Sequence, residues 1–292
     1  MKIGFFLGHN SKELIMWFNS YKYSSIALLT VVFITAFWLT SCFGFGRSQD
    51  WKLVWSDEFN YEGLPDASKW SYDTVGNAYG WGNRELQYYT VKRDSNALAD
   101  GEFLHIIAHK ERYMGFDYTS ARLTSKAKGD WLYGRIEVKV KVPGGRGIWP
   151  AIWMLPSDNE YGGWPNSGEI DIMEHVGFNP DSIFTTLHTH AFNHNINTQV
   201  GEDIYLPDSE EKFYLYAIEW FEDRIDFYID QNKVFTFTNS GKGSEEWPFD
   251  KRFHLILNVA VGGNWGGAQG IDESIFPAAM LIDYVRVYER VK

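Results

Sequence analysis

The run GEIDIMEHVG constrains the fold of this chain more than any other segment. Glu169 and Asp171 are two residues apart, so in a β-strand their side chains share one face. Glu174 is an odd number of residues from Glu169, and a regular strand would turn it to the opposite face. One extra residue, a β-bulge around Ile172 and Met173, would bring Glu174 back. The run therefore predicts a bulged strand with three carboxylates on one face.

Acidic side chains on one face of an apolar strand repel one another, so this pattern indicates a function. In glycosidases, one carboxylate attacks the anomeric carbon, and a second, kept protonated by its neighbours, gives a proton to the leaving oxygen. The spacing also fits an exposed acidic edge strand or a metal site. The surrounding sequence has to decide among the three.

The composition limits the kinds of partner. The 292 residues carry a net charge of −11, and 17% of them are aromatic, including 13 Trp and 17 Tyr. No basic patch stands out, so we expect no nucleic-acid partner. The chain has more aromatic side chains than a core needs, which favours a neutral or weakly charged ligand. We also expect the protein to be a monomer.

The N-terminal segment has the features of an export signal. Residues Ile26–Thr40 carry no charge, Lys22 precedes them, and the sequence LTSC ends them at Cys42. LTSC resembles the bacterial lipobox, in which the Cys becomes the lipidated N-terminus. Cys42 is the only cysteine, which excludes a disulfide. We therefore expect an exported bacterial lipoprotein of the cell envelope or outer membrane surface, held to the membrane by a lipid at Cys42.

Other interpretations of this segment stay open. The uncharged stretch Tyr23–Gly46 is long enough to span a bilayer as an anchor, and an ordinary cleaved signal would give a secreted protein. Met16 is a second candidate for the start of the protein. We expect a signal peptide at 1–41, a linker at 42–50 and one catalytic domain at 51–290.

Strand patterns dominate the rest of the chain. In GRIEVKVKV, apolar residues from Ile136 onward alternate with charged ones, which predicts a strand with one buried and one solvent-exposed face. Residues 231–233 predict a hairpin connection. Further strands are predicted at 213–221, 224–230, 234–238, 253–261 and 281–288. Together they predict an all-β, antiparallel β-sandwich, a curved jelly roll with a concave substrate cleft.

Several aromatic side chains lie near the acidic run or in segments rich in Gly and Asn. Trp149 and Trp153 precede the run, whereas Trp81 and Trp265 lie in loop-like stretches. Flat indole faces suit the C–H faces of sugar rings, although core packing explains many Trp residues equally well. His188, in TTLHTH, is expected on a strand beside the cleft, with a structural role as its alternative.

With these motifs, the chain resembles glycoside hydrolase family 16, and most of all its bacterial laminarinases, which are endo-β-1,3-glucanases. The resemblance runs from about Trp55 to Tyr288 through WSDEF, GWGNRELQYYT, YTSARLTSK, GRIEVKVKVPGGRGIWPAIWMLP, GEIDIMEHVG, HTH, YAIEW, WPFD, LNVAVGGNWGG and DYVRVY. It implies a β-jelly roll and hydrolysis with retention. The predicted bulge separates the ExDxxE signature from the ExDxE branch of the family, to which the lichenases belong.

The resemblance implies a role for each acid: Glu169 as nucleophile, Glu174 as general acid/base, and Asp171 as the residue that orients and tunes them. It implies sugar-binding positions on the donor side and near the cut, at Asn83, Glu85, Arg122, Trp149, Trp153, His188 and Trp265. Arg84 departs from the family, since many members have Asn at this position. The added charge affects which sugar the donor side prefers.

A structural calcium ion also follows from the resemblance. Its ligands would be backbone oxygens of Glu58 and Gly101 and the carboxylate of Asp283. Oxygen ligands suit this hard cation. Catalysis itself calls for no cofactor.

The expected function is endo-acting, retaining hydrolysis of β-1,3-glucan of the laminarin type, with the polysaccharide as partner. Alternatives within the family are a mixed-linkage β-1,3-1,4-glucanase, a hydrolase of agar or carrageenan, and transglycosylation. Sulfated galactans call for basic residues, for which Arg84, Arg122 and Arg146 are candidates. A non-catalytic β-glucan-binding protein would lack the carboxylates, and an adhesion lipoprotein would not need the aromatic loops.

Overall fold

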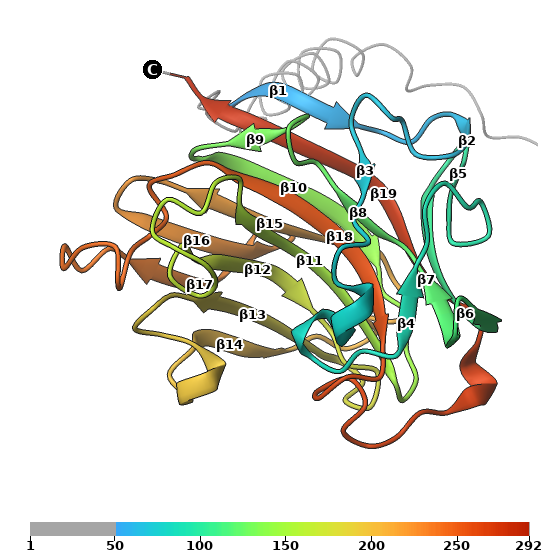
Figure 1. Cartoon of the computed structure of the whole chain (residues 1–292). Helices are drawn as coiled ribbons and strands as arrows, with labels where there is room; N and C mark the ends of the chain where they lie inside the picture. The colour runs from blue at the N-terminus through green and yellow to red at the C-terminus, as the bar shows by residue number, and fades with distance from the viewer. Residues whose placement is uncertain (1–50, 292) are drawn as a thin grey trace, which may run out of the picture. The chain divides into compact units, whose positions relative to one another are not determined.

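The computed structural model describes residues 51–291, and within them two β-sheets pack face to face (Figure 1). The sheets belong to a compact unit that runs from Asp50 to Lys292. The predicted signal, lipobox and linker fall on residues 1–50 and lie outside the described residues.

The larger sheet has 11 strands and the smaller sheet has 8. The main path of the larger sheet is, in spatial order, β17 (Asn232–Thr238), β16 (Arg224–Ile229), β15 (Tyr214–Trp220), β10 (Gly134–Lys141), β19 (Ala278–Arg290), β6 (Leu104–Tyr113), β5 (Ala97–Asp100) and β2 (Glu62–Gly63). Beside this path, β1 (Trp51–Asp57) pairs with β19, and β7 (Phe116–Ser120) pairs with β6 and with β4 (Gln87–Tyr89).

The smaller sheet carries the acidic run in its interior. Its order is β14 (Val200–Tyr205), β13 (Ser182–His188), β12 (Glu169–Glu174), β11 (Ile148–Pro156), β18 (Phe253–Val261), β8 (Arg122–Thr124) and β3 (Ser71–Tyr72), with β9 (Asp130–Trp131) against β18. Strand pairs in both sheets are antiparallel, apart from the parallel pair of β4 and β7.

Helical structure is limited to short segments. Residues 51–291 contain three 3-10 helices, η1 (Asn77–Gly82), η2 (His194–Ile196) and η3 (Glu273–Ile275). A search of the described part of the chain finds no helix with the length and apolar character needed to cross a membrane.

Alternating apolar residues build the core between the two sheets. Ile136 and Val138 of β10 are fully buried, as the sequence pattern predicts, and they share one apolar cluster with Leu255 and Leu257 of β18. Each such side chain contributes about 1.5–3 kcal/mol through burial. Because one face of each central strand of the smaller sheet is committed to this core, the other face of β11, β12 and β13 points away from it.

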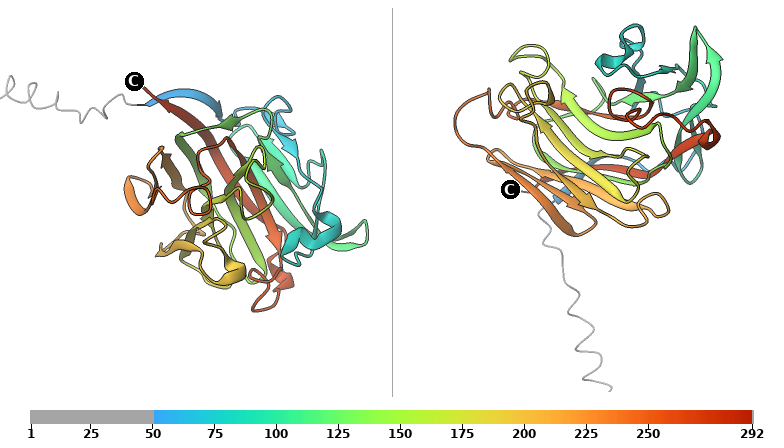
Figure 2. Two further views of the ribbon diagram at one scale, coloured as in Figure 1. Left: turned by 60° about the vertical axis from the view of Figure 1, so that its left-hand side comes forward. Right: turned by 90° about the horizontal axis from the view of Figure 1, so that it is seen from below.

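Both sheets are curved, and the outer face of the smaller sheet is concave (Figure 2). The segment containing η1 and the connection between β11 and β12 rise at the sides of this face (Figure 2). The predicted antiparallel sandwich, a curved jelly roll, is confirmed.

The outer face of β10 differs from the sequence prediction. Arg135 and Glu137 are only 5% and 4% exposed, not solvated. Arg135 donates hydrogen bonds to Glu137 (2.6 Å) and Glu219 (2.8 Å), and its guanidinium lies over the ring of Tyr228. Strand alternation cannot show this burial, because Glu219 comes from the adjacent strand β15 and Tyr228 from β16 beyond it.

The predicted hairpin connection at 231–233 is also placed differently. Its turn consists of Asp230 and Gln231, whereas Asn232 and Lys233 already belong to β17. Asp230 has a positive φ of 54°, as tight hairpin turns require at their first central position. Asp tolerates this conformation, so a two-residue turn replaces the longer one.

Candidate active site

The bulge predicted in the acidic run is present in β12. Ile152 of β11 pairs with Met173, and the next residue, Trp153, pairs with Asp171, so Ile172 has no partner in β11. The pairing of β12 with β13 shifts at the same place. One extra residue therefore lies between Asp171 and Glu174, and the prediction from strand parity is confirmed.

The bulge decides which side chains face the core. Ile172 and Met173 are both buried in the apolar cluster between the sheets, although they are neighbours in sequence. Glu174 is thereby returned to the concave face, where Glu169 and Asp171 also lie. The strand thus buries two consecutive apolar side chains and still presents its three carboxylates to one side.

His188 on β13 lies directly beside these carboxylates. It pairs with Glu169 across the two strands, and its Nε2 is 3.8 Å from Glu169 Oε1 and 3.4 Å from Asp171 Oδ2. The ring is only 6% exposed. The structure therefore places this predicted residue within reach of two acids at once.

Burial dominates the electrostatics of the three acids. It raises the pKa of Asp171 to about 8, and the hydrogen bond with Glu169 partly opposes the rise. Burial and then the charge of Asp171 raise the pKa of Glu174 to about 8. The same two causes raise the pKa of Glu169 well above its usual range, opposed by His188 and, more weakly, Arg122. Three carboxylates in this arrangement titrate as one system, which holds protons at neutral pH.

Trp149 and Trp265 form an aromatic corner at Glu174. Trp149, on the concave face of β11, donates a hydrogen bond from Nε1 to Glu174 Oε1 at 3.1 Å. Its ring meets Trp265 edge to face at 5.5 Å, and Trp265 in turn meets Phe184 of β13 at 4.8 Å. Both predicted tryptophans therefore lie beside the third acid, and both are partly exposed.

Arg122 and Trp153 lie farther along the same face. The guanidinium of Arg122 is sandwiched between the rings of Trp81 and Trp153, with its Cζ 4.3 Å and 4.5 Å from the two centroids. Its Nε donates to Asp73 Oδ2 at 3.1 Å. The stack fixes two indole planes by cation–π contact, and a sugar-binding surface requires such fixed planes.

Asn83 and Glu85 are joined to Trp153 through buried polar groups. Glu85, only 8% exposed, accepts hydrogen bonds from Asn83 (3.4 Å) and from the hydroxyl of Tyr89 (3.3 Å). Asn258 of β18 donates to the same hydroxyl at 3.0 Å and accepts from Trp153 Nε1 at 2.7 Å. Burial raises the pKa of Glu85, and hydrogen bonds and the charge of Arg122 oppose the rise. All seven predicted sugar-binding residues thus belong to one connected surface.

Some residues of this surface were not predicted. Trp164, 39% exposed, lies in the connection between β11 and β12, with its ring 5.8 Å from His188 and 4.9 Å from His194. Its surroundings, GGWPN, have the Gly- and Asn-rich character that singled out Trp265, so the same argument applied to Trp164 would have found it. Tyr89 and Asn258 carry no such signal. Arg84, the departure from the family, is exposed between Asn83 and Glu85.

The predicted calcium ligands lie away from the carboxylates, along β19 and its neighbours. Asp283 Oδ2 is 2.6 Å from Lys139 Nζ, and the carboxylate of Glu58 pairs with Arg286 at 2.7 Å. The oxygen-bearing residues are suitable in type, but the one carboxylate already has a cationic partner. In the described part of the chain, the side chains grouped closely enough to hold a metal ion are Glu169, Asp171 and His188.

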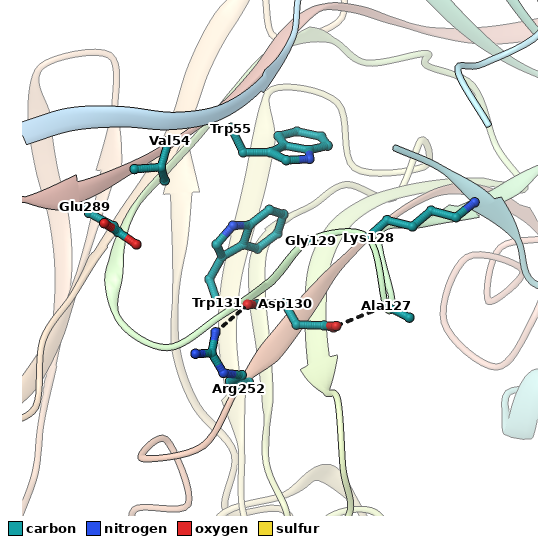
Figure 3. Close-up of a pocket in the computed structure, with 9 residues that line it drawn as sticks. All are labelled: Val54, Trp55, Ala127, Lys128, Gly129, Asp130, Trp131, Arg252 and Glu289. Carbon is teal, nitrogen blue, oxygen red and sulfur yellow. Dashed lines mark hydrogen bonds between the residues drawn. The ribbon is translucent and has the colours of Figure 1, made fainter. Parts of the chain in front are cut away.

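A separate hollow of about 510 Å³ lies by β1 and β9 (Figure 3). Trp55 and Trp131 meet there edge to face at 5.4 Å, and Arg252 donates to the backbone oxygen of Asp130 at 2.8 Å. Its lining contains none of the predicted site residues. The chemistry of the acids is therefore independent of this hollow.

Comparisons with known proteins agree with the geometry. The family model for glycosyl hydrolases family 16 matches residues 84–286. A β-glucanase from Rhodothermus marinus is 52% identical over 253 residues, covering 84% of this chain and 88% of that protein. The X-ray structure of the laminarinase from Rhodothermus marinus matches with a TM-score of 0.80 at 52% identity, covering 83% of this chain and 98% of the other. The structure of SCLam, a non-specific endo-β-1,3(4)-glucanase, matches with a TM-score of 0.79 at 47% identity, covering 83% and 92%.

Proposed function

The chain belongs to glycosyl hydrolases family 16, and from that membership we propose that it is an endo-acting hydrolase of β-1,3-glucan that retains the anomeric configuration. The observation that carries the proposal is the bulge in β12, which puts Glu169, Asp171 and Glu174 on one face. The similar laminarinase and β-glucanase support glucan as the substrate class.

In the first step, the carboxylate of Glu169 attacks the anomeric carbon and forms a glycosyl ester, while the bond to the leaving oxygen breaks. Glu174 gives its proton to that oxygen. In the second step, Glu174 takes a proton from water, the water oxygen attacks the anomeric carbon, and Glu169 is released as a carboxylate. Asp171 lies between the two and orients them.

The electrostatics of the site suit this change of role. Glu174 keeps its proton at neutral pH because burial and the charge of Asp171 raise its pKa to about 8. Two basic side chains, His188 and Arg122, both act to lower the pKa of Glu169, which favours its ionised form. Once Glu169 is esterified, its charge disappears, and the pKa of Glu174 falls, which makes Glu174 a better base for the second step.

The aromatic and polar residues of the concave face would bind the glucan. Trp149 and Trp265 stand at Glu174, whereas Trp153, Arg122 and Glu85 extend the surface beyond it. Indole faces contact sugar C–H groups. Glu85 and Asn83 would form hydrogen bonds with the hydroxyl groups of the sugar.

Product analysis tests the proposal. The purified protein is incubated with laminarin, mixed-linkage β-1,3-1,4-glucan and agarose, and the first products are followed by NMR at the anomeric carbon. We expect short β-1,3-gluco-oligosaccharides from laminarin, with the β-anomer formed first. Exclusive cleavage of agarose would overturn the substrate, and first formation of the α-anomer would overturn the mechanism.

Mixed-linkage glucan is the second candidate substrate. The support is SCLam, a non-specific endo-β-1,3(4)-glucanase that shares the fold at 47% identity. The same incubation separates the candidates, because a strict β-1,3-glucanase releases little from mixed-linkage glucan.

We also propose export as a lipoprotein anchored through Cys42. The support is the uncharged stretch Ile26–Thr40 followed by LTSC. Mass spectrometry of the mature N-terminus tests this: a peptide beginning at a lipidated Cys42 is expected, and an unmodified peptide that spans Ser41 and Cys42 would contradict it.

Calcium binding at Glu58, Gly101 and Asp283 stays a prediction. In the structure, Lys139 pairs with the carboxylate of Asp283 and would compete with the ion for it. An ion there would have to displace Lys139 from Asp283. We therefore expect the melting temperature of the wild-type protein to change little with EDTA, and the Lys139→Met variant to respond more to added calcium. A large loss of wild-type stability in EDTA would show that calcium prevails over the lysine.

A further inference from the structure

Within residues 51–291, one group of closely placed His and acidic side chains could hold a metal ion, and it consists of two predicted catalytic acids and one predicted sugar-binding residue. Glu169, Asp171 and His188 each offer one ligand atom, and these atoms lie within 4.8 Å of one another. Two of the residues are almost wholly enclosed, with Asp171 at 3% and His188 at 6% exposure. They lie on the neighbouring strands β12 and β13, whose apolar side chains are buried on the opposite face and so fix the direction of the three ligands.

Two buried atoms of this group lack a hydrogen-bond partner. Among the described residues, Asp171 Oδ2 and His188 Nδ1 are enclosed without one, and of these Asp171 Oδ2 is the atom that belongs to the proposed site, because the ring nitrogen of His188 near the acids is Nε2. Asp171 Oδ2 points toward His188, with Nε2 of the ring 3.4 Å away. A buried acceptor left unsatisfied in this way is costly, and a bound cation would supply the missing partner.

The spacing matches the first shell of zinc. Zinc binds His nitrogen and carboxylate oxygen at about 2.0–2.2 Å in a tetrahedron, so neighbouring ligand atoms stand about 3.4 Å apart. The corresponding distances are 3.4 Å from His188 Nε2 to Asp171 Oδ2 and 3.8 Å to Glu169 Oε1. The third separation, between the two carboxylates, is within 4.8 Å, so side-chain rotations have to draw the three ligand atoms closer together. Three protein ligands leave the fourth position open toward the concave face.

We propose that Glu169, Asp171 and His188 form a binding site for a zinc ion that inhibits the enzyme. A zinc ion held there occupies the oxygens of Glu169 that would attack the sugar, so zinc and glucan exclude each other. The imidazole ligand selects zinc over calcium and magnesium, which take oxygen ligands in larger shells. The site would thus make hydrolysis sensitive to zinc without any separate regulatory domain.

Calorimetry with zinc chloride alone tests the site without reference to activity. We expect one zinc ion per chain for the wild type, and an affinity weaker by about tenfold or more for His188→Gln and Asp171→Asn, since outer-shell changes already cost 10–100-fold. His105→Gln is the matched control: His105 pairs with Asp100 at 2.7 Å in the other sheet, without a third ligand. This variant should bind zinc as the wild type does.

Several results would overturn the proposal. Unchanged zinc affinity in Asp171→Asn would do so, and this substitution preserves shape if His188→Gln proves unstable. On laminarin, zinc should raise KM with little change in kcat, and EDTA should reverse the effect. Inhibition that lowers kcat alone would place the ion elsewhere. Because calorimetry needs no substrate, a protein that binds zinc but cleaves no glucan would refute the proposed function and leave the zinc site standing.

Discussion

The hydrogen bond from Trp149 distinguishes Glu174 from the other two acids. Trp149 Nε1 donates to Glu174 Oε1 at 3.1 Å, and the contact acts to lower the pKa of Glu174 against the larger effect of burial. Trp153, on the same face of the same strand, donates instead to Asn258 at 2.7 Å. Of these two indoles, Trp149 therefore acts directly on the pKa of the proposed proton donor and Trp153 does not.

Replacing Trp149 by Phe removes this donor while keeping an aromatic ring. The pKa of Glu174 should rise by about half a unit to one unit, the worth of one hydrogen bond. Because Glu174 must be protonated to start the reaction, the alkaline limb of kcat/KM should move to higher pH by the same amount. A pH series of laminarin hydrolysis measures the shift.

The control is Trp153→Phe, which loses a hydrogen bond of the same kind to Asn258. Its alkaline limb should stay in place, although KM should rise because the sugar-binding surface is weaker. An equal shift of the alkaline limb in both variants would mean that this limb does not report the ionisation of Glu174.

At the scale of single strands, the bulge was predictable and the environment of β10 was not. The bulge follows from parity within one run, since Glu169 and Glu174 can share a face only if one residue is added. The burial of Arg135 depends on Glu219 and Tyr228, which belong to other strands. Local spacing therefore predicts where a side chain points, but not what covers it.

Length changes in β12 test the role of the bulge. Deleting Ile172 removes the extra residue and leaves the last Glu on the concave face, as in the ExDxE pattern. Inserting Ala between Ile172 and Met173 makes the spacing of Glu169 and Glu174 even, so a strand without a bulge carries both on the concave face, but about 7 Å farther apart along the strand than in the deletion variant. We expect the deletion to retain detectable hydrolysis of laminarin, and the insertion to have none.

Stability measurements accompany these variants. The deletion loses one buried side chain, so its free energy of unfolding should fall by about 2–5 kcal/mol. The insertion should destabilise the domain too, because it shifts the pairing of the residues after it with β11 and β13. If the insertion variant hydrolysed laminarin as well as the deletion variant does, the spacing that the bulge sets between Glu169 and Glu174 would not govern hydrolysis.

At the scale of the molecule, the site joins segments that are far apart in sequence. Tyr89 and Asn258, which link Glu85 to Trp153, are 169 residues apart. No spacing within the chain reveals such a contact. Trp149, Trp153, Trp265 and His188 were singled out by their place in the sequence, whereas Asn83, Glu85 and Arg122 were predicted only through the family resemblance. The fold was predicted more fully, since alternating strands and the absence of helical periodicity restrict the chain to a sandwich.

The buried acids also affect the stability of the whole domain. Burial raises the pKa of Asp171 and of Glu174 to about 8, whereas in the unfolded chain both lie near about 4. Between these values the folded state holds more protons than the unfolded state. The stabilisation is therefore fully present below about pH 4 and is lost as the pH rises through about 8.

We therefore expect the free energy of unfolding to fall between pH 5 and pH 9, by up to about 1.4 kcal/mol per pH unit for each such group. Asp171→Asn removes one titrating group, so the free energy of unfolding of this variant should depend less on pH. As the pH rises, the variant should therefore become more stable relative to the wild type. Chemical denaturation at several pH values measures both slopes.

Asp226→Asn provides the control for this experiment. Burial acts to raise the pKa of Asp226, but hydrogen bonds from Thr236 and Arg224 outweigh it and lower the pKa below its usual range. Asp226 is thus ionised in both states throughout the window from pH 5 to pH 9, and its replacement should shift stability by the same amount at every pH. A slope in Asp171→Asn equal to that of the wild type would show that Asp171 is ionised in the folded protein, and the three acids would then not share protons at neutral pH.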